Sequence, residues 1–149
     1  SARWWREVRT GHLVLVGGDY SMAEGDTHED FRYLDGGFTR RRKAGGREHL
    51  LGLYVQDIWR PAPRLELTAG LRVDYWRSED GRRRERDTTS GTETIDQTFS
   101  SRDEVFASPR LGLLFDASSS LALRASAYRG FRAPTLNELY RPFRVRIVY

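Results

Sequence analysis

Apolar and polar residues alternate strictly along several stretches of the chain. The clearest stretch runs from Leu65 to Trp76, where every odd position is apolar or aromatic and the even positions are mostly polar or small. A period of two lines up the apolar side chains on one face of a β-strand, whereas a helix would scatter them. Globular strands have about 5–6 residues, but a tilted strand crossing a bilayer needs about 9–11. The length of this stretch therefore predicts a membrane-spanning strand.

The alternation recurs along the chain in four further, partly noisier stretches. The sequence predicts five long strands, at residues 12–24, 47–60, 64–77, 104–116 and 120–130, with sequential neighbours paired antiparallel. We also expect residues 2–8 to be the end of a preceding strand and residues 143–149 to be a strand stub.

Each predicted strand has one apolar face and one polar face. In residues 12–21 both parities are apolar at first, and we place Val14, Val16, Gly18 and Tyr20 outward because this choice puts Asp19 inside. In the later strands the alternation puts these residues on one face: Leu67, Ala69, Leu71, Val73, Leu111, Leu113, Leu123 and Ala125.

The connections between the predicted strands alternate between short and long. Residues 9–11, 61–63 and 117–119 form short turns, whereas residues 24–47 and 77–104 are long, polar and rich in Gly, Asp, Arg and Thr. This rhythm is typical of an up-and-down membrane barrel with short periplasmic turns and long extracellular loops. Unstructured loops of such length are uncommon in compact soluble domains. The predicted fold class is all-β: an antiparallel up-and-down meander, forming a segment of a transmembrane β-barrel.

Composition narrows the alternatives. Charged residues make up 31% and apolar residues 38% of the chain, and an aromatic share of 12% is too high for a disordered chain. The absence of cysteine excludes a disulfide framework. No apolar run approaches the ~20 residues of a membrane helix. The net charge is +4, and nearly all of the basic residues are arginines. Such a charge would favour binding to nucleic acid, anionic lipid or an acidic ligand. An arginine-rich genome would explain the arginine content equally well.

Four motifs, in order along the chain, resemble the barrel of TonB-dependent outer-membrane receptors. They span residues 54–59 (YVQDIW), 68–75 (TAGLRVDY), 108–112 (SPRLG) and 129–140 (RGFRAPTLNELY), and the resemblance covers roughly residues 12–142. It implies a large barrel filled by an N-terminal plug. It also implies import of scarce nutrients, such as ferric siderophores, similar metal chelates or cobalamin, with energy from the TonB complex.

The resemblance also sets expectations for the organisation of the chain. A barrel must close to remove its strand edges, so we expect residues 1–149 to be a partial barrel without the plug. The implied location is the bacterial outer membrane. The implied partners are outer-membrane lipid, the TonB complex through the plug, and a small metal chelate or vitamin. The alternative is a structural or adhesive barrel, or a soluble β-rich binding module, without transport activity.

Two sets of polar residues are candidates for function. Four charged residues have the inward parity and are expected to face the lumen: Arg72, Asp74, Arg110 and Arg124. They would line a substrate path or, as we favour, form ion pairs across strands in a hydrated interior. The candidate ligand contacts are basic and aromatic residues of the loops and upper lumen, since arginine suits an anionic chelate and an aromatic ring its flat organic part: Arg82, Arg83, Arg84, Tyr128, Arg132 and Tyr140.

Other clusters support no specific chemistry. Two basic runs, residues 40–43 and 82–86, are expected in mid-loop and would bind lipopolysaccharide phosphates or an anionic chelate, or be solvated loop charge, which we favour. They lack the interleaved aromatics of a nucleic-acid site, and we expect no nucleic-acid partner. Residues 26–30 lack the calcium-loop pattern, and no catalytic motif is present. We expect no enzyme activity, no metal site and no cofactor.

Residues 132–140 combine a proline with a polar stretch after the last predicted strand. Pro134 would end the hydrogen-bond ladder, and Asn137 and Glu138 would cap a turn. We favour this structural interpretation over a loop that reaches toward a ligand or the plug.

Overall fold

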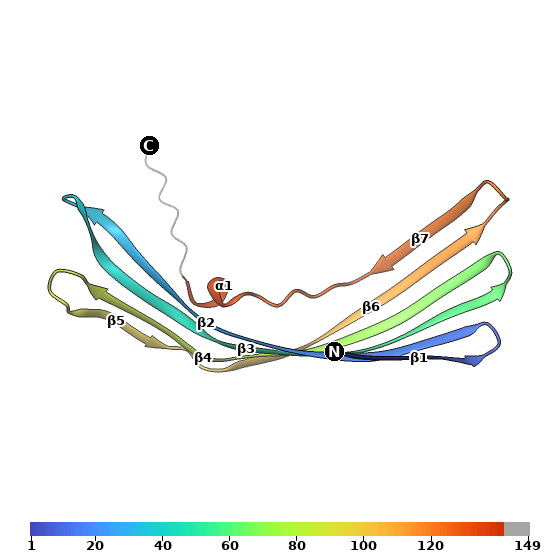
Figure 1. Ribbon diagram of the computed structural model, residues 1–149, viewed down its shortest axis with the longest axis horizontal. Helices are drawn as coiled ribbons and strands as arrows, with labels where there is room; N and C mark the ends of the chain where they lie inside the picture. The colour runs from blue at the N-terminus through green and yellow to red at the C-terminus, as the bar shows by residue number, and fades with distance from the viewer. Residues whose placement is uncertain (142–149) are drawn as a thin grey trace. The chain divides into compact units, whose positions relative to one another are not determined.

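The computed structural model describes residues 1–141 of the chain, so the predicted stub at 143–149 lies outside the described residues. The elements, in chain order, are β1 (Ala2–Arg9), β2 (His12–Leu34), β3 (Gly37–Ala62), β4 (Leu65–Asp87), β5 (Glu93–Thr98), β6 (Arg102–Asp116), β7 (Ala122–Tyr128) and α1 (Leu136–Tyr140) (Figure 1). The predicted all-β meander is confirmed.

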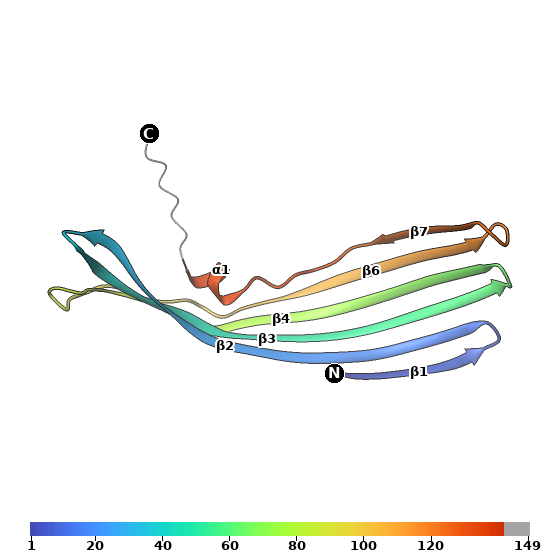
Figure 2. The ribbon, with the colours of Figure 1, turned by 45° about the horizontal axis from the view of Figure 1, so that its top comes forward.

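The strands form one antiparallel sheet in the order β1-β2-β3-β4-β6-β7, with β5 paired to β4 off this path. Figure 2 shows β1 to β4, β6 and β7 side by side in chain order. Few side chains among residues 1–141 are buried, and half of them are polar: Ala44, Trp76, Tyr140, Asp74, Ser78 and Glu85. The sheet is a single layer and does not close within the described residues.

The predicted strand positions are right, but β2, β3 and β4 are much longer than predicted and β7 is shorter. Residues 24–47 and 77–104 were expected to be loops throughout, but most of each range is paired strand. Residues 24–34 continue β2 and residues 37–47 belong to β3; residues 77–87 continue β4, and β5 lies within residues 93–98. The polar composition of these segments suggested loops, yet both faces of an extended strand can be polar when cross-strand ion pairs satisfy their charges.

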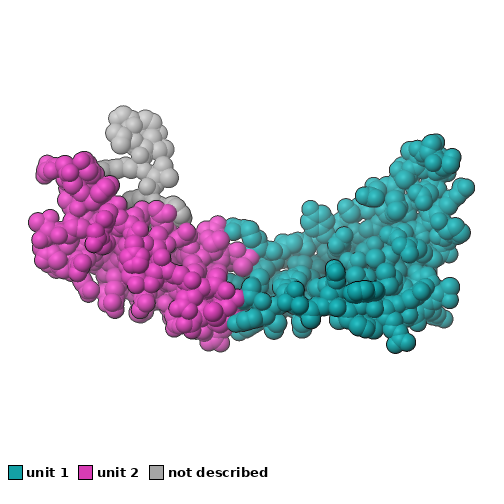
Figure 3. Space-filling model, in the orientation of Figure 1, with its two compact units in different colours: residues 1–21, 50–76, 104–132 teal, residues 22–49, 77–103, 133–149 magenta. Residues whose placement is uncertain are grey.

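The chain divides into two compact units, coloured separately in Figure 3. Unit 1 contains residues 1–21, 50–76 and 104–132; unit 2 contains residues 22–49, 77–103 and 133–149.

Unit 1 has one apolar face. In the β6–β7 ladder Leu111 lies opposite Ala127 and Leu113 opposite Ala125, so these side chains share a face. A Cβ added to Gly112 would touch Thr68, so the even positions of β6 and β4 share the other face. The odd positions of β4, including Leu71, therefore lie on the apolar face, as the alternation predicts.

The register of β2 also follows the sequence argument. A Cβ on Gly18 would meet the side chain of Leu53, which belongs to the apolar face, whereas one on Gly17 would meet the Tyr54 hydroxyl. Asp19, two residues after Gly17, has the same parity and lies on the polar face of unit 1. The outward assignment of Gly18 and its parity mates is thus correct.

Unit 2 contains a β-bulge in β4. Ser78 hydrogen-bonds the Tyr140 hydroxyl, and a Cβ on Gly81 would collide with the Tyr140 ring. Residues three apart in a regular strand face opposite sides, so one extra residue must lie between them. Asp80 supplies it, with a φ of 55°. Beyond the bulge Arg83 and Glu85 lie on the side of the sheet that carries Tyr140, called the Tyr140 face, and Arg82 and Arg84 lie on the opposite face.

The tip of the β2–β3 hairpin is a two-residue turn. Asp35 and Gly36 have φ values of 48° and 85°, the pair of positive φ angles that defines a type I′ turn. We predict that Gly36→Ala raises the free energy of the turn by about 1–2 kcal/mol, because an L side chain is strained there. Hydrogen exchange of the tip amides should accelerate. Gly37→Ala is the control, since Gly37 has no positive φ and open space around it; equal acceleration in both variants would contradict the assignment.

No helix among the described residues is long and apolar enough to cross a membrane.

Candidate functional site

A network of charged side chains lies on the Tyr140 face of unit 2. Arg42 is its centre: its Nε donates to Glu85 Oε1 at 2.7 Å, and its Nη1 donates to Glu29 Oε2 at 3.2 Å. The guanidinium also lies 4.2 Å from the centroid of the Phe31 ring, a cation–π distance. Arg42 is largely buried, with 13% of its side chain exposed. The network thus fixes a guanidinium beside an aromatic ring.

Glu29 links this network to the end of α1. Arg141 donates from Nη2 to Glu29 Oε1 at 2.7 Å and from Nε to Glu29 Oε2 at 3.3 Å. These hydrogen bonds, helped by the charge of Arg42, hold the pKa of Glu29 below its ordinary value against the opposing effect of burial. Glu29 is therefore a carboxylate shared by two arginines.

Two further arginines on this face keep unused donors. Arg40 Nη2 lies 3.8 Å from Asp87, and Arg83 Nε lies 3.9 Å from Glu85 Oε1, beyond hydrogen-bond reach. Arg40 Nη1 and Arg83 Nε are buried and have no hydrogen-bond partner among the described residues. Buried donors without partners cost free energy, and they suit an anionic group that enters from outside the chain.

The opposite face of unit 2 carries a row of exposed ion pairs. Arg41 binds Asp30 through two hydrogen bonds of 2.7 and 3.0 Å, and Lys43 Nζ lies 2.8 Å from Asp26 Oδ2. Exposed pairs of this kind contribute little stability each. They do explain how the polar segments of β2 and β3 stay extended.

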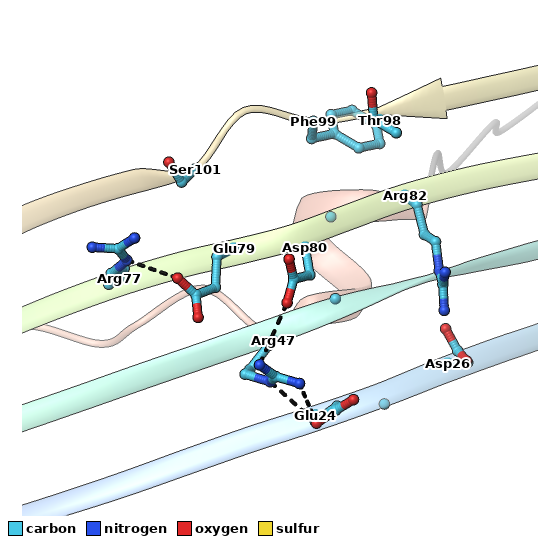
Figure 4. Close-up of a pocket in the computed structure, with 13 residues that line it drawn as sticks. Glu24, Asp26, Arg47, Arg77, Glu79, Asp80, Arg82, Thr98, Phe99 and Ser101 are labelled. Carbon is cyan, nitrogen blue, oxygen red and sulfur yellow. Dashed lines mark hydrogen bonds and ion pairs between the residues drawn. The ribbon is translucent and has the colours of Figure 1, made fainter.

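An open hollow of about 900 Å³ lies on this opposite face, where β5 ends and β6 begins. Figure 4 shows Arg47 between Glu24 and Asp80, with its nitrogens 3.1 Å and 3.4 Å from their carboxylates. Arg77 Nε donates to Glu79 Oε2 at 2.9 Å in the same view. Five of the charged residues at this hollow are thus paired with one another: Glu24, Arg47, Arg77, Glu79 and Asp80.

The polar face of unit 1 carries an ion-paired triad. Arg72 donates to both Asp19 oxygens, at 2.7 and 3.0 Å, and its Nη2 lies 2.7 Å from Asp74 Oδ1. Asp74 is 5% exposed. Gly52 gives the guanidinium its space, because a Cβ there would collide with Arg72. Arg72 thus pairs across strands with Asp19 of β2, as we favoured, whereas its contact with Asp74 lies within β4.

The other lumen candidates lie on the same face of β6 and β7. Arg110 lies opposite Tyr128 and Arg124 opposite Leu114, so all four share the face that carries Gly112 and Thr68. Tyr128 is 79% exposed.

The candidate ligand residues occupy different surroundings. The expectation that Arg82–Arg84 lie in mid-loop is wrong, because all three belong to β4. Consecutive strand residues alternate between faces, so Arg83 lies on the Tyr140 face while Arg82 and Arg84 lie opposite, Arg84 with its Nε 3.2 Å from Asp96. Arg132 is exposed in unit 1. Tyr140 is 6% exposed in unit 2.

Sequence reasoning missed the network around Arg42. Glu29, Arg42, Glu85 and Arg141 are far apart in the chain, and residues 24–47 were expected to be loop, where no face can be assigned. Had the segment been treated as a strand, alternation alone would have separated Arg40 and Arg42 from Arg41 and Lys43. The same alternation separates Glu29 from Asp26, His28 and Asp30. Within residues 1–141 no group of three or more His, Cys, Asp or Glu side chains could hold a metal ion.

Comparison with known families identifies the chain. The family model for the TonB-dependent receptor-like β-barrel matches residues 2–147. The chain belongs to the TonB-dependent receptor β-barrel family. No curated protein and no solved structure gives a significant match.

Membership in the TonB-dependent receptor family accounts for the two faces of unit 1. The family consists of outer-membrane transport proteins rather than enzymes. In a transmembrane barrel one side of each strand meets lipid and the other faces a polar interior. The face with Leu71, Leu111 and Ala125 is the lipid side, and the face with the Arg72 triad is the interior side.

Proposed function

We propose that the chain is part of a receptor that imports a bulky, scarce solute across the outer membrane with energy supplied by TonB. The solute is a ferric siderophore or similar metal chelate, or cobalamin. The observation that carries the proposal is the family match over residues 2–147. An outer membrane has no nucleotide supply of its own, so energised import needs a partner in the inner membrane, reached through the plug of the complete receptor.

The charge network on the Tyr140 face supports an anionic solute. On this face Arg40, Arg42, Arg83 and Arg141 approach the carboxylates of Glu29, Glu85 and Asp87, and these contacts leave some of the arginine nitrogens unused. The buried, unpartnered nitrogens of Arg40 and Arg83 offer donors to such a solute.

We propose that the six candidate residues contact the solute, and the structure supports some of them more than others. Arg83 has the strongest support, because its side chain is on the Tyr140 face and its Nε, although buried, has no hydrogen-bond partner among the described residues. Tyr128 and Arg132 are exposed and accessible to a solute. Arg82 and Arg84 lie on the opposite face, and Tyr140 is buried, so these three would contact the solute only after the chain rearranges.

The test is uptake of labelled ferric siderophores and cobalamin by cells that carry the full-length gene or its deletion. We expect the gene to support uptake of one of these solutes, and dissipation of the inner-membrane potential to abolish that uptake. Unchanged uptake of every candidate on deletion, with no response of expression to iron or cobalamin limitation, would contradict the importer assignment and favour a structural or adhesive barrel.

Two neighbouring arginines give a matched pair of variants for the solute that is found. Arg83→Ala should weaken binding to whole cells by about tenfold, the loss of one charge-assisted contact. Arg84→Ala removes the same charge from the opposite face and should leave binding unchanged. Equal effects of the two variants would show that the charge of the hairpin, and not the Tyr140 face, attracts the solute.

A further inference from the structure

Residues 133–141, called the strap, lie across the Tyr140 face of unit 2. The strap contains the short helix α1, and Figures 1 and 2 both show α1 on one side of β2, β3 and β4. Its contacts with the sheet include those of Asn137, Tyr140 and Arg141.

Tyr140 fills a slot in the sheet. Gly46 and Gly81 form the floor of the slot: a Cβ on Gly46 would come within 2.7 Å of the Tyr140 ring, and one on Gly81 would overlap it. The Tyr140 hydroxyl hydrogen-bonds the Ser78 hydroxyl, and Phe99 packs against the ring with centroids 5.1 Å apart. Ser78 is 1% exposed. Tyr140 is the main apolar anchor of the strap.

The other two anchors are polar. Thr27 Oγ1 donates to Asn137 Oδ1 at 2.8 Å, and Arg141 binds Glu29 as described above. Exposed and half-buried contacts of this kind contribute little net stability, because water replaces them when they break. These polar contacts of the strap can therefore be exchanged for contacts with water.

The helix of the strap supplies its own N-terminal cap. Thr135 Oγ1 accepts from the Glu138 backbone N–H at 3.3 Å, and Glu138 Oε2 accepts from the Thr135 backbone N–H at 2.8 Å. This capping box satisfies N-terminal donors without any group of the sheet. The cap is thus not lost when the strap leaves the sheet.

Docking of the strap also has an unfavourable component. Glu48 lines the space beneath residues 133–137, and its Oε1 is buried with no hydrogen-bond partner among the described residues. The Glu138 carboxylate of the strap lies close enough to Glu48 to repel it. A buried carboxyl oxygen without a hydrogen bond opposes the docked position of the strap.

From these contacts we propose that the strap is a releasable cover, which must lift off the Tyr140 face for the receptor to import its solute. The inference rests on the proposed import function. Lifting withdraws Tyr140 from the slot and separates Arg141 from Glu29, which opens the face that carries Arg42 and Arg83. Moving elements belong to the less stable parts of a structure, and the exchangeable polar contacts of the strap suit such an element.

The first experiment locks the strap in the full-length receptor. Thr27→Cys and Asn137→Cys replace two residues in contact, and a disulfide or short bis-maleimide joins them. We expect the cross-linked receptor to lose uptake by roughly tenfold or more, as for a gated step that is blocked, and reduction of the disulfide to restore it. Wild-type uptake by a fully cross-linked receptor would contradict the proposal that the strap is a releasable cover.

A cross-link elsewhere in unit 2 is the matched control. Asp30→Cys and Arg41→Cys join β2 to β3 on the opposite face, where the side chains already pair, and should leave uptake unchanged. Loss of uptake in this control as well would mean that any cross-link that stiffens the β2–β3 hairpin blocks import. That result would contradict the proposal that the strap is a cover. A reduced parent that imports no tested solute would instead overturn the import function.

The second experiment detects lifting without any solute. Ser78→Cys places a thiol beneath Tyr140, and its reaction with a maleimide in the purified receptor reports exposure of the slot. Adding Gly81→Ala, which pushes against the Tyr140 ring, should raise the reaction rate by roughly tenfold. A thiol at position 35, on the exposed hairpin tip, gives the rate of unhindered reaction. If Gly81→Ala leaves the rate at position 78 unchanged, the strap does not lift and the proposal fails.

Discussion

Replacement of Ala125 by arginine should lower the free energy of unfolding of the membrane-inserted receptor by about 2–4 kcal/mol. Ala125 lies near the middle of β7, opposite Leu113 and on the apolar face of unit 1. An arginine there must leave water and enter hydrocarbon, where no group can solvate its charge. The measurement is urea unfolding of the full-length receptor in lipid vesicles.

Ser126→Arg is the control for this prediction. Ser126 is the next residue of β7 and lies opposite Gly112 on the polar face, where there is room and water. We expect a change within about 0.5 kcal/mol, as for substitutions away from buried features. Equal destabilisation by the two substitutions, or a larger effect at Ser126, would show that the assignment of faces is wrong.

Removal of Arg72 should have the second largest effect. Arg72→Met keeps the stem of the side chain but leaves Asp19 and Asp74 without their shared cation. Because Asp74 is almost fully buried and Asp19 is only partly exposed, the cost lies between those of an exposed and a buried pair. We expect a loss of about 1–3 kcal/mol in the free energy of unfolding.

Two further variants test the cause of this effect. Arg124→Met removes an exposed arginine from the same face of unit 1 and should change the stability little. Arg72→Met combined with Asp74→Asn should recover part of the loss, because the second change removes the buried charge that lost its partner. If the double variant is no more stable than Arg72→Met alone, the network is not electrostatic in origin.

The strands of unit 1 could be predicted because lipid and water demand opposite side chains on the two faces of one strand. Residues 65–76 therefore alternate with a period of two. In β2 the outward face was less clear, but it could be assigned once Asp19 was placed on the polar side. The extensions of β2, β3 and β4 could not be found in this way. Both of their faces are polar, so their sequence resembles that of a loop, and only pairs such as Arg41 with Asp30 reveal a strand.

The candidate site was less predictable than the fold for a related reason. Each face of a strand is known only if its register is regular, and the bulge at Asp80 shifts the register by one residue. Without it Arg82 and Arg84, rather than Arg83, would lie on the Tyr140 face. The glycines that receive Tyr140 carry no sequence signal for an aromatic partner 59 and 94 residues away. Register and long-range packing are properties of the folded sheet.

The most direct test of the account is the side of the membrane on which each end of the strands lies. In a cysteine-free full-length receptor, single cysteines at positions 35 and 90, in the turns after β2 and β4, should react with a membrane-impermeant maleimide on intact cells. Cysteines at positions 10, 63 and 118, in the short turns, should react only after the outer membrane is permeabilised. Labelling of both sets on intact cells, or the reverse pattern, would contradict a barrel segment whose strands cross the outer membrane with their long hairpins outside.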